Sequence, residues 1–98
     1  MRPVVLSWHA RADLREIAAF IAADDPARAA RFVTELRARC QSLSHHPMQD
    51  RPAPEIDPDL RILVFRAYLI LHRVHDDTVR IDRVVHAARD LSALWPHD

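Results

Sequence analysis

The chain contains no glycine, no lysine and a single cysteine, Cys40, among its 98 residues. Loops that hold a phosphate against the backbone use glycine, because a Cβ atom would obstruct the close approach. Walker loops, dinucleotide-binding fingerprints and G-x-S-x-G nucleophile elbows are therefore excluded. One cysteine permits neither an internal disulfide nor a thiolate zinc site.

Long apolar runs are also missing. No stretch approaches the roughly 18 consecutive apolar residues of a membrane-spanning helix. The apolar run at the start of the chain is too short for the core of a signal peptide. Together with the single cysteine, this predicts a cytoplasmic protein.

Charge of one sign is not in excess, because fourteen arginines balance fourteen acidic residues and the pI is near 7.1. Without a net positive field, the protein has no general attraction to nucleic acid or to anionic membranes. The length and the 49% apolar content predict one soluble globular domain over residues 1–98.

The first half of the sequence predicts a strand followed by two helices. A β-branched run predicts a strand over 4–8, and apolar residues at three- and four-residue spacing predict an amphipathic helix from Ala12 to Asp24–Asp25. Asp25 is the expected N-cap of the second helix, and Pro26 its first residue. That helix is expected to end near His46.

The second half predicts a proline-rich loop and then three strands. Four prolines lie between residues 47 and 58, a density that neither a helix nor a central strand tolerates. Strands are predicted over 60–65, 68–75 and 78–86, joined by the two-residue turns 66–67 and 76–77. A short helix is predicted over 87–95. The element order is β-α-α-β-β-β, an α+β fold.

Two-residue turns would fix the register of these three strands. One face would then carry the rows Phe65–Tyr68–Val85, Leu63–Ile70–Arg83 and Arg61–His72–Ile81. The other face would carry the rows Val64–Leu69–Val84, Ile62–Leu71–Asp82 and Leu60–Arg73–Arg80. A helical hairpin can cover only one face, so we expect the other to be a docking surface.

The predicted register places Arg61, His72 and Arg83 together on one face. Two guanidinium groups beside an imidazole would attract an anion, so this cluster is a candidate site for a carboxylate supplied by a partner. The alternative is that all three point to solvent.

Other sites are less favoured by the residue spacing. The seven histidines show no helical H-x-x-x-H pair, so we expect no metal and no other cofactor. Cys40 falls on an apolar helical stripe, which favours a buried thiol over a nucleophile. The arginines of the second helix suit a solvated face better than an RNA groove; they are Arg28, Arg31, Arg37 and Arg39.

Several segments, taken in order, resemble the ParE toxins of the ParE/RelE toxin–antitoxin superfamily. They are residues 13–22, 24–26, 30–32, 51–55, 68–70 and 86–90. The resemblance implies a curved antiparallel sheet packed on one face by an N-terminal helical hairpin. It also implies inhibition of DNA gyrase and neutralisation by a ParD-type antitoxin, in a hetero-oligomer with it. The glycines that the family has before its Arg-Pro and in its first hairpin turn are absent here.

RelE-type ribosome-dependent mRNA endoribonucleases are the alternative that the resemblance leaves open. Arg89 matches one of their basic residues, but Leu69 stands at the position of their strand arginine and Trp95 at that of their C-terminal tyrosine. We therefore expect a toxin that binds a protein and is not an enzyme, with Arg89, Asp90 and Trp95 contacting the target. A DNA-binding regulator is weaker still, since no basic recognition helix is predicted.

Overall fold

The computed structural model describes residues 2–48, 50–75 and 77–88 of the chain. Its helices are α1 (Trp8–Ala22) and α2 (Pro26–Gln41), followed by the 3-10 turn η1 (Ser42–Ser44). Its strands are β1 (Val4–Leu6), β2 (Arg51–Pro52), β3 (Leu60–Phe65), β4 (Tyr68–Val74) and β5 (Val79–His86). The fold is therefore α+β, as predicted.

The strands form one mixed sheet in the order β1-β5-β4-β3-β2. The pairs β2–β3, β3–β4 and β4–β5 are antiparallel, but β1 runs parallel to β5, with Val4 opposite Val79. The prediction of a wholly antiparallel sheet is therefore wrong, because a three-residue strand carries no local signal of its direction. Strand β2, within the segment predicted as a loop, is a further departure.

Helix α1 begins at Trp8, earlier than the predicted start at Ala12. Ser7 Oγ accepts a hydrogen bond from the Ala10 N–H at 3.0 Å and donates one to the Asp82 carbonyl at 2.8 Å. This serine therefore caps the helix and ties its start to β5. The strand predicted over 4–8 ends at Leu6 as a consequence.

Helix α2 begins as predicted. The Asp25 carboxylate accepts a hydrogen bond from the Arg28 N–H at 3.0 Å, and Pro26 lies in the first turn. The helix ends at Gln41, before the predicted end near His46, and tightens into η1, where Leu43 is fully buried.

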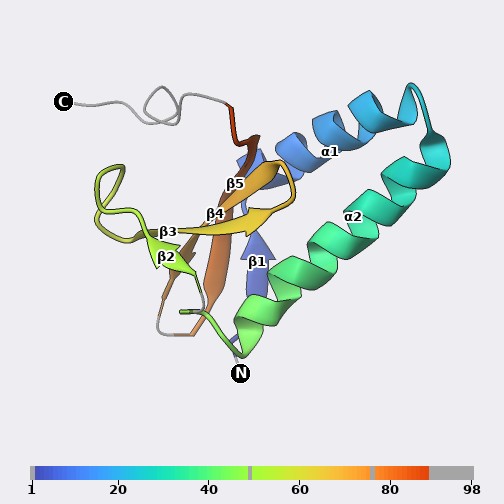
Figure 1. The fold of residues 1–98 in the computed structure, drawn as a ribbon. Coiled ribbons are helices and arrows are strands. Elements are labelled where there is room, and N and C mark those ends of the chain that lie inside the picture. Colours follow the sequence, from blue (N-terminus) through green and yellow to red (C-terminus); the bar gives the residue numbers. More distant parts are fainter. Residues whose placement is uncertain (1, 49, 76, 89–98) are drawn as a thin grey trace.

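The helices cover one face of the sheet, as Figure 1 shows. Leu14, Phe32 and Leu36 of the helices belong to the same buried cluster as Ile70 and Ile81 of the sheet. This is the predicted face that carries Leu63, Ile70 and Ile81.

The opposite face is partly covered by the segment between β2 and β3, which lies on the side of the sheet away from the helices (Figure 1). A second apolar cluster joins Ala53 and Ile56 of this segment to sheet residues, namely Leu60, Ile62, Leu71 and Val85. The prediction that this face is uncovered is therefore wrong for that cluster. Val64 stays 57% exposed.

The first β-hairpin has the predicted turn at Arg66–Ala67, between Phe65 and Tyr68. Arg66 has a φ of 54°, the left-handed region that a glycine would adopt without strain. In the second hairpin Val74 pairs with Val79, which is the predicted register, although both strands are one residue shorter than predicted.

A β-bulge changes the register in the middle of the sheet. The row Arg61–His72–Ile81 is confirmed, but the β4–β5 pairing shifts between Leu71 and His72. Arg83 therefore lies opposite Leu71 and not opposite Ile70. The predicted β5 partners beyond this point are wrong, because a bulge inserts one unpaired residue and turns the following side chains to the other face. The predicted β3–β4 pairs are confirmed, as is the row Leu60–Arg73–Arg80.

The helix predicted over 87–95 falls on residues 89–98 for most of its length, outside the described residues. Within the described part of the chain, neither helix has the length and hydropathy needed to span a membrane.

Candidate partner-binding site

Arg61 and His72 meet at Asp50, a residue that the sequence had not pointed to. One oxygen of Asp50 accepts a hydrogen bond from Arg61 Nε at 2.9 Å, and the other contacts His72 Nε2. The His72 side chain is fully buried, and that of Asp50 is 3% exposed. The carboxylate that we expected from a partner is thus present within this chain.

This buried cluster favours the charged form of Asp50. Burial alone would raise the pKa of Asp50, but hydrogen bonds and electrostatic attraction from His72 and Arg61 outweigh it and lower that pKa below 3.8. His72 Nδ1 has no hydrogen-bond partner in the described structure. The cluster fastens the chain before β2 to strands β3 and β4, and a role for Arg61 and His72 in binding a partner stays a prediction.

Arg83 is separate from this cluster because of the bulge. Its guanidinium donates two hydrogen bonds to Asp13 of α1, at 2.8 and 2.9 Å, and Asp13 also accepts one from the Val84 N–H at 2.9 Å. Hydrogen bonding to Asp13 raises the pKa of Arg83. Asp13 is only 7% exposed, so this two-pronged contact connects α1 firmly to β5.

Every arginine between residues 51 and 83 has a carboxylate partner. The pairs are Arg51–Glu55 at 3.3 Å, Arg61–Asp50 at 2.9 Å, Arg66–Glu35, Arg73–Asp57 at 2.8 Å, Arg80–Asp82 at 3.4 Å and Arg83–Asp13 at 2.8 Å. Arg73 also donates to Asp82 at 2.6 Å, whereas Arg80 lies near the other Asp82 oxygen without a hydrogen bond to it. The positive charge of the sheet is therefore neutralised locally.

The arginines of the α1–α2 hairpin are different. None of the six forms an ion pair within the described structure; they are Arg11, Arg15, Arg28, Arg31, Arg37 and Arg39. Two acidic residues of the hairpin, Asp13 and Glu35, pair with arginines of the sheet instead. Three carboxylates of the hairpin, Glu16, Asp24 and Asp25, also form no ion pair there, so the hairpin presents a net positive charge that no ion pair within the described residues neutralises.

Three of these arginines border a groove of about 380 Å³ between α1 and α2. Its lining contains Arg11, Arg15 and Arg37 over an apolar floor that includes Leu14 and Val33, and it contains no carboxylate. An apolar floor with a cationic rim is complementary to an amphipathic segment that carries negative charge. We define this as the arginine groove.

The arginine groove was not predicted from the sequence. Arg37 was expected on a solvated helix face, and Arg11 and Arg15 were not among the candidate site residues. A signal was present, since Arg11 and Arg15 lie four residues apart and flank Leu14 of the apolar stripe. Which sides of the two helices face each other is a tertiary property, so the spacing alone could not define a groove.

The remaining predicted sites are less informative. Burial raises the pKa of the Cys40 thiol to about 11, although Arg37 counteracts it, and such a thiol is not the reactive thiolate that a nucleophile requires. The described residues include no group of three histidine, cysteine or acidic side chains placed to hold a metal ion. Arg89, Asp90 and Trp95 lie outside the described residues, so their role stays a prediction.

Comparison with known proteins yields toxins of toxin–antitoxin systems. Residues 4–91 match the family model described as "ParE toxin of type II toxin-antitoxin system, parDE". The chain is 36% identical over 89 residues to "Toxin RelE2" of Caulobacter vibrioides, covering 91% of this chain and 99% of the relative. It is 33% identical over 93 residues to "Putative toxin Y4kP" of Sinorhizobium fredii, covering 93% of this chain and 92% of the relative.

A solved structure shares the fold. The structure described as "Chromosomal ParDE TA system from P. aeruginosa" matches with a TM-score of 0.75 at 21% sequence identity. The match covers 88% of this chain and 96% of the other.

Proposed function

Because this chain belongs to the ParE family of type II toxins, we propose that it inhibits growth by binding DNA gyrase and that a ParD-type antitoxin neutralises it. Because gyrase acts on DNA in the cytoplasm, we expect the toxin to act there. A toxin paired with its antitoxin in this way would stabilise the plasmid or chromosomal region that encodes both.

The arginine groove is the observation that supports an antitoxin partner most directly. Three guanidinium groups that have no carboxylate partner among the described residues surround an apolar floor, and Leu6 of edge strand β1 also lines the groove. An amphipathic antitoxin segment with acidic residues would bury its apolar side there and neutralise all three charges. This contact would also place the segment beside the free edge of β1.

Binding is favoured over RNA cleavage by the state of the sheet side chains. His72 is fully buried, and the sheet arginines from 51 to 83 are all held by carboxylates of this chain. Leu69 also stands where the ribonuclease relatives would have an arginine. His72 could therefore not act as a general base on a ribose, and none of these arginines is free of a carboxylate to hold the phosphate. Arg89, Asp90 and Trp95 remain proposed contacts with the target.

The antitoxin contact is tested by reversing the charge of the groove. The triple variant Arg11→Glu, Arg15→Glu and Arg37→Glu is purified with the protein encoded immediately upstream, and binding is measured by calorimetry. We expect the dissociation constant to rise at least 100-fold, because three attractive contacts become repulsive. Far-UV circular dichroism should be unchanged, since none of the three arginines forms an ion pair within the described structure.

A matched control changes the same number of charges elsewhere on the hairpin. Arg28→Glu, Arg31→Glu and Arg39→Glu together should leave antitoxin affinity within about threefold. An equal loss of antitoxin affinity in both variants would mean that only net charge matters, and it would contradict antitoxin binding at the arginine groove. Gyrase supercoiling and primer extension on translated mRNA then separate the two modes of toxicity: codon-specific cuts without gyrase inhibition would overturn the proposed mechanism.

A further inference from the structure

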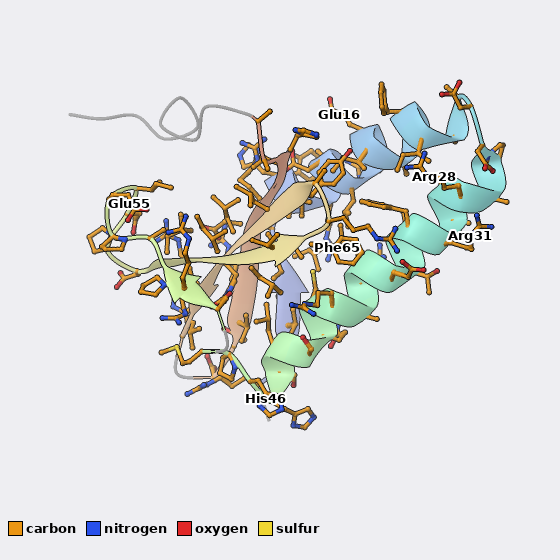
Figure 2. The ribbon with its side chains drawn as sticks, viewed as in Figure 1. Glu16, Arg28, Arg31, His46, Glu55 and Phe65 are labelled. Carbon is orange, nitrogen blue, oxygen red and sulfur yellow. The ribbon has the colours of Figure 1, made fainter. Side chains whose placement is uncertain are left out.

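The other three unpaired arginines lie on a different side of α2 from the groove. Arg28, Arg31 and Arg39 are exposed and follow one another at three- and eight-residue spacing, which keeps them on one helical flank. Figure 2 shows Arg28 and Arg31 on the half of α2 nearest the α1–α2 turn. Glu35 shares this flank, but Arg66 of the β3–β4 turn already pairs with it.

This flank ends at a cleft of about 160 Å³ between the α1–α2 turn and the β3–β4 turn. Arg28, Phe20 and Tyr68 contribute to its lining, with Phe32 and Arg66. Phe20 is 78% exposed, a large apolar side chain left in water at the edge of a cleft. Asp24 is the one carboxylate in the lining.

The floor of the cleft is built from aromatic rings packed against one another. Phe32 makes edge-to-face contacts with Phe65 and Tyr68, with ring centroids 5.5 and 5.3 Å apart. The Arg66 guanidinium lies 5.1 Å from the Phe65 ring centroid and 5.9 Å from that of Phe32. A preformed cleft of this kind loses little conformational entropy when it accepts a side chain.

We propose that this surface, the flank of Arg28, Arg31 and Arg39 together with the cleft beside Phe20, binds an acidic segment of the toxin's protein target that inserts one apolar side chain. Aromatic residues and arginine are the types enriched at binding hot spots. The three unpaired cations are complementary to carboxylates, and the cleft volume suits a single side chain. The proposal rests on the toxin function proposed above and adds a target surface distinct from the arginine groove.

A protein segment fits this surface better than a nucleic acid. Asp24 in the cleft and Glu35 on the flank would repel a continuous phosphate backbone, and the chain has no net positive charge. A short acidic segment can place its few charges opposite the arginines and away from both carboxylates, so that only its apolar side chain enters the cleft beside Asp24. The aromatic rings of the floor also meet edge to face and offer no stacked platform for bases.

The test compares two triple variants that carry equal changes in charge. The flank variant (Arg28→Glu, Arg31→Glu, Arg39→Glu) and the groove variant (Arg11→Glu, Arg15→Glu, Arg37→Glu) are each expressed from a tight promoter, with and without the antitoxin. Cells expressing the flank variant without antitoxin should plate at least 100-fold more efficiently than cells expressing wild type, because growth inhibition is lost. The flank variant should still bind antitoxin. The groove variant should remain toxic and escape neutralisation.

The cleft is tested by Phe20→Ala with Trp8→Ala as its control, since both aromatic side chains belong to α1 and are 78% and 74% exposed. Phe20→Ala should weaken toxicity and the inhibition of purified gyrase at least 10-fold, while Trp8→Ala should change neither. Thermal melts of all variants establish that they fold.

Each other outcome decides a different question. A wild-type chain that does not inhibit growth refutes the proposed function and, with it, this inference. If wild type is toxic and the flank variant and Phe20→Ala are equally toxic, the target surface is refuted and the proposed function is not. Loss of antitoxin binding in the flank variant would assign the surface to the antitoxin, and flank-dependent binding of a single-stranded 30-nucleotide RNA would assign it to nucleic acid; either result overturns the inference.

Discussion

The sheet and the helical hairpin each carry six arginines, and the two regions use them in opposite ways. Between residues 51 and 83 every arginine meets a carboxylate of this chain, whereas none of the six in α1 and α2 forms an ion pair within the described structure. A formal charge of zero therefore conceals a separation of paired and unpaired charge. Four of the six pairs in the sheet join segments that are distant in the chain, and the unpaired arginines are available to partners.

The comparison predicts that charge changes in the sheet affect stability and that charge changes in the hairpin affect binding. Ion pairs with buried members are costly to break, because the remaining charge loses its partner in a site with little water. Exposed, unpaired side chains contribute little to folding.

The largest effect should follow from Asp50→Asn. This substitution leaves the Arg61 guanidinium without its carboxylate, in a cluster where the Asp50 side chain is 3% exposed. We expect the free energy of unfolding to fall by about 3 kcal/mol, measured by urea denaturation. Asp24→Asn, a carboxylate with no ion pair in the described structure, is the control and should change stability by less than about 0.5 kcal/mol. Equal effects of the two substitutions would remove the distinction.

Arg83→Ala should be the next most damaging change. Asp13 would keep its hydrogen bond from the Val84 N–H but lose the guanidinium, at a cost of about 2 kcal/mol. Arg37→Ala in the arginine groove should cost less than about 0.5 kcal/mol. Urea denaturation of both variants measures the two losses of stability. An equal loss for Arg37→Ala and Arg83→Ala would contradict the difference between hairpin and sheet.

Acid should weaken the sheet cluster in a defined direction. The pKa of Asp50 is lowered in the folded protein, so the unfolded chain binds more protons as the pH falls through and below 3.8. The stabilisation is present in full above that range and is lost below it. Urea titrations at pH values from about 2.5 to about 6 should therefore show that the free energy of unfolding falls more steeply with acid for wild type than for Asp50→Asn. Parallel curves would contradict this assignment.

The smallest effect concerns Arg66, whose ion pair is a surface contact. Its side chain is 54% exposed and its partner Glu35 47% exposed, so the pair contributes about 0–1 kcal/mol. The positive φ of Arg66 costs about 1 kcal/mol relative to glycine. We expect Arg66→Gly to be about 1 kcal/mol more stable than Arg66→Ala, because both lose the side chain and only glycine relieves the strain. Identical melting temperatures would exclude strain at this turn.

Local signals predicted much of the fold. Asp25 and Pro26 mark the start of α2 without help from tertiary contacts. The Asp25 carboxylate accepts a hydrogen bond from a free N–H of the first turn, and Pro26 has no N–H that would need a partner there. The turn at Arg66–Ala67 follows from the strands that flank it. Ser7 offered an equally local signal for the start of α1, since a serine cap before an apolar stripe is visible in the sequence, and we placed that start too late.

The candidate site was predicted less well. Arg61 and His72 were placed together correctly, but their carboxylate partner Asp50 was not foreseen because it precedes β2 in a proline-rich loop. Arg83 was misplaced because a bulge forms where Asp82 and the start of α1 meet, and strand alternation contains no sign of it. The arginine groove depends on which sides of α1 and α2 face each other.

The sequence by itself determined that one strand precedes two helices and a three-strand meander, the helix cap at Asp25, the register of the row Arg61–His72–Ile81 and the family, because capping, periodicity and short turns act between neighbouring residues. Only the tertiary structure decided that β1 runs parallel to β5 and that, among the described residues, the sheet arginines form ion pairs while those of the hairpin do not. Asp13 and Arg83 show the reason: the two side chains are 70 residues apart in the chain, and their contact exists only once α1 has packed against β5. Net charge and local pattern carry no information on such a contact.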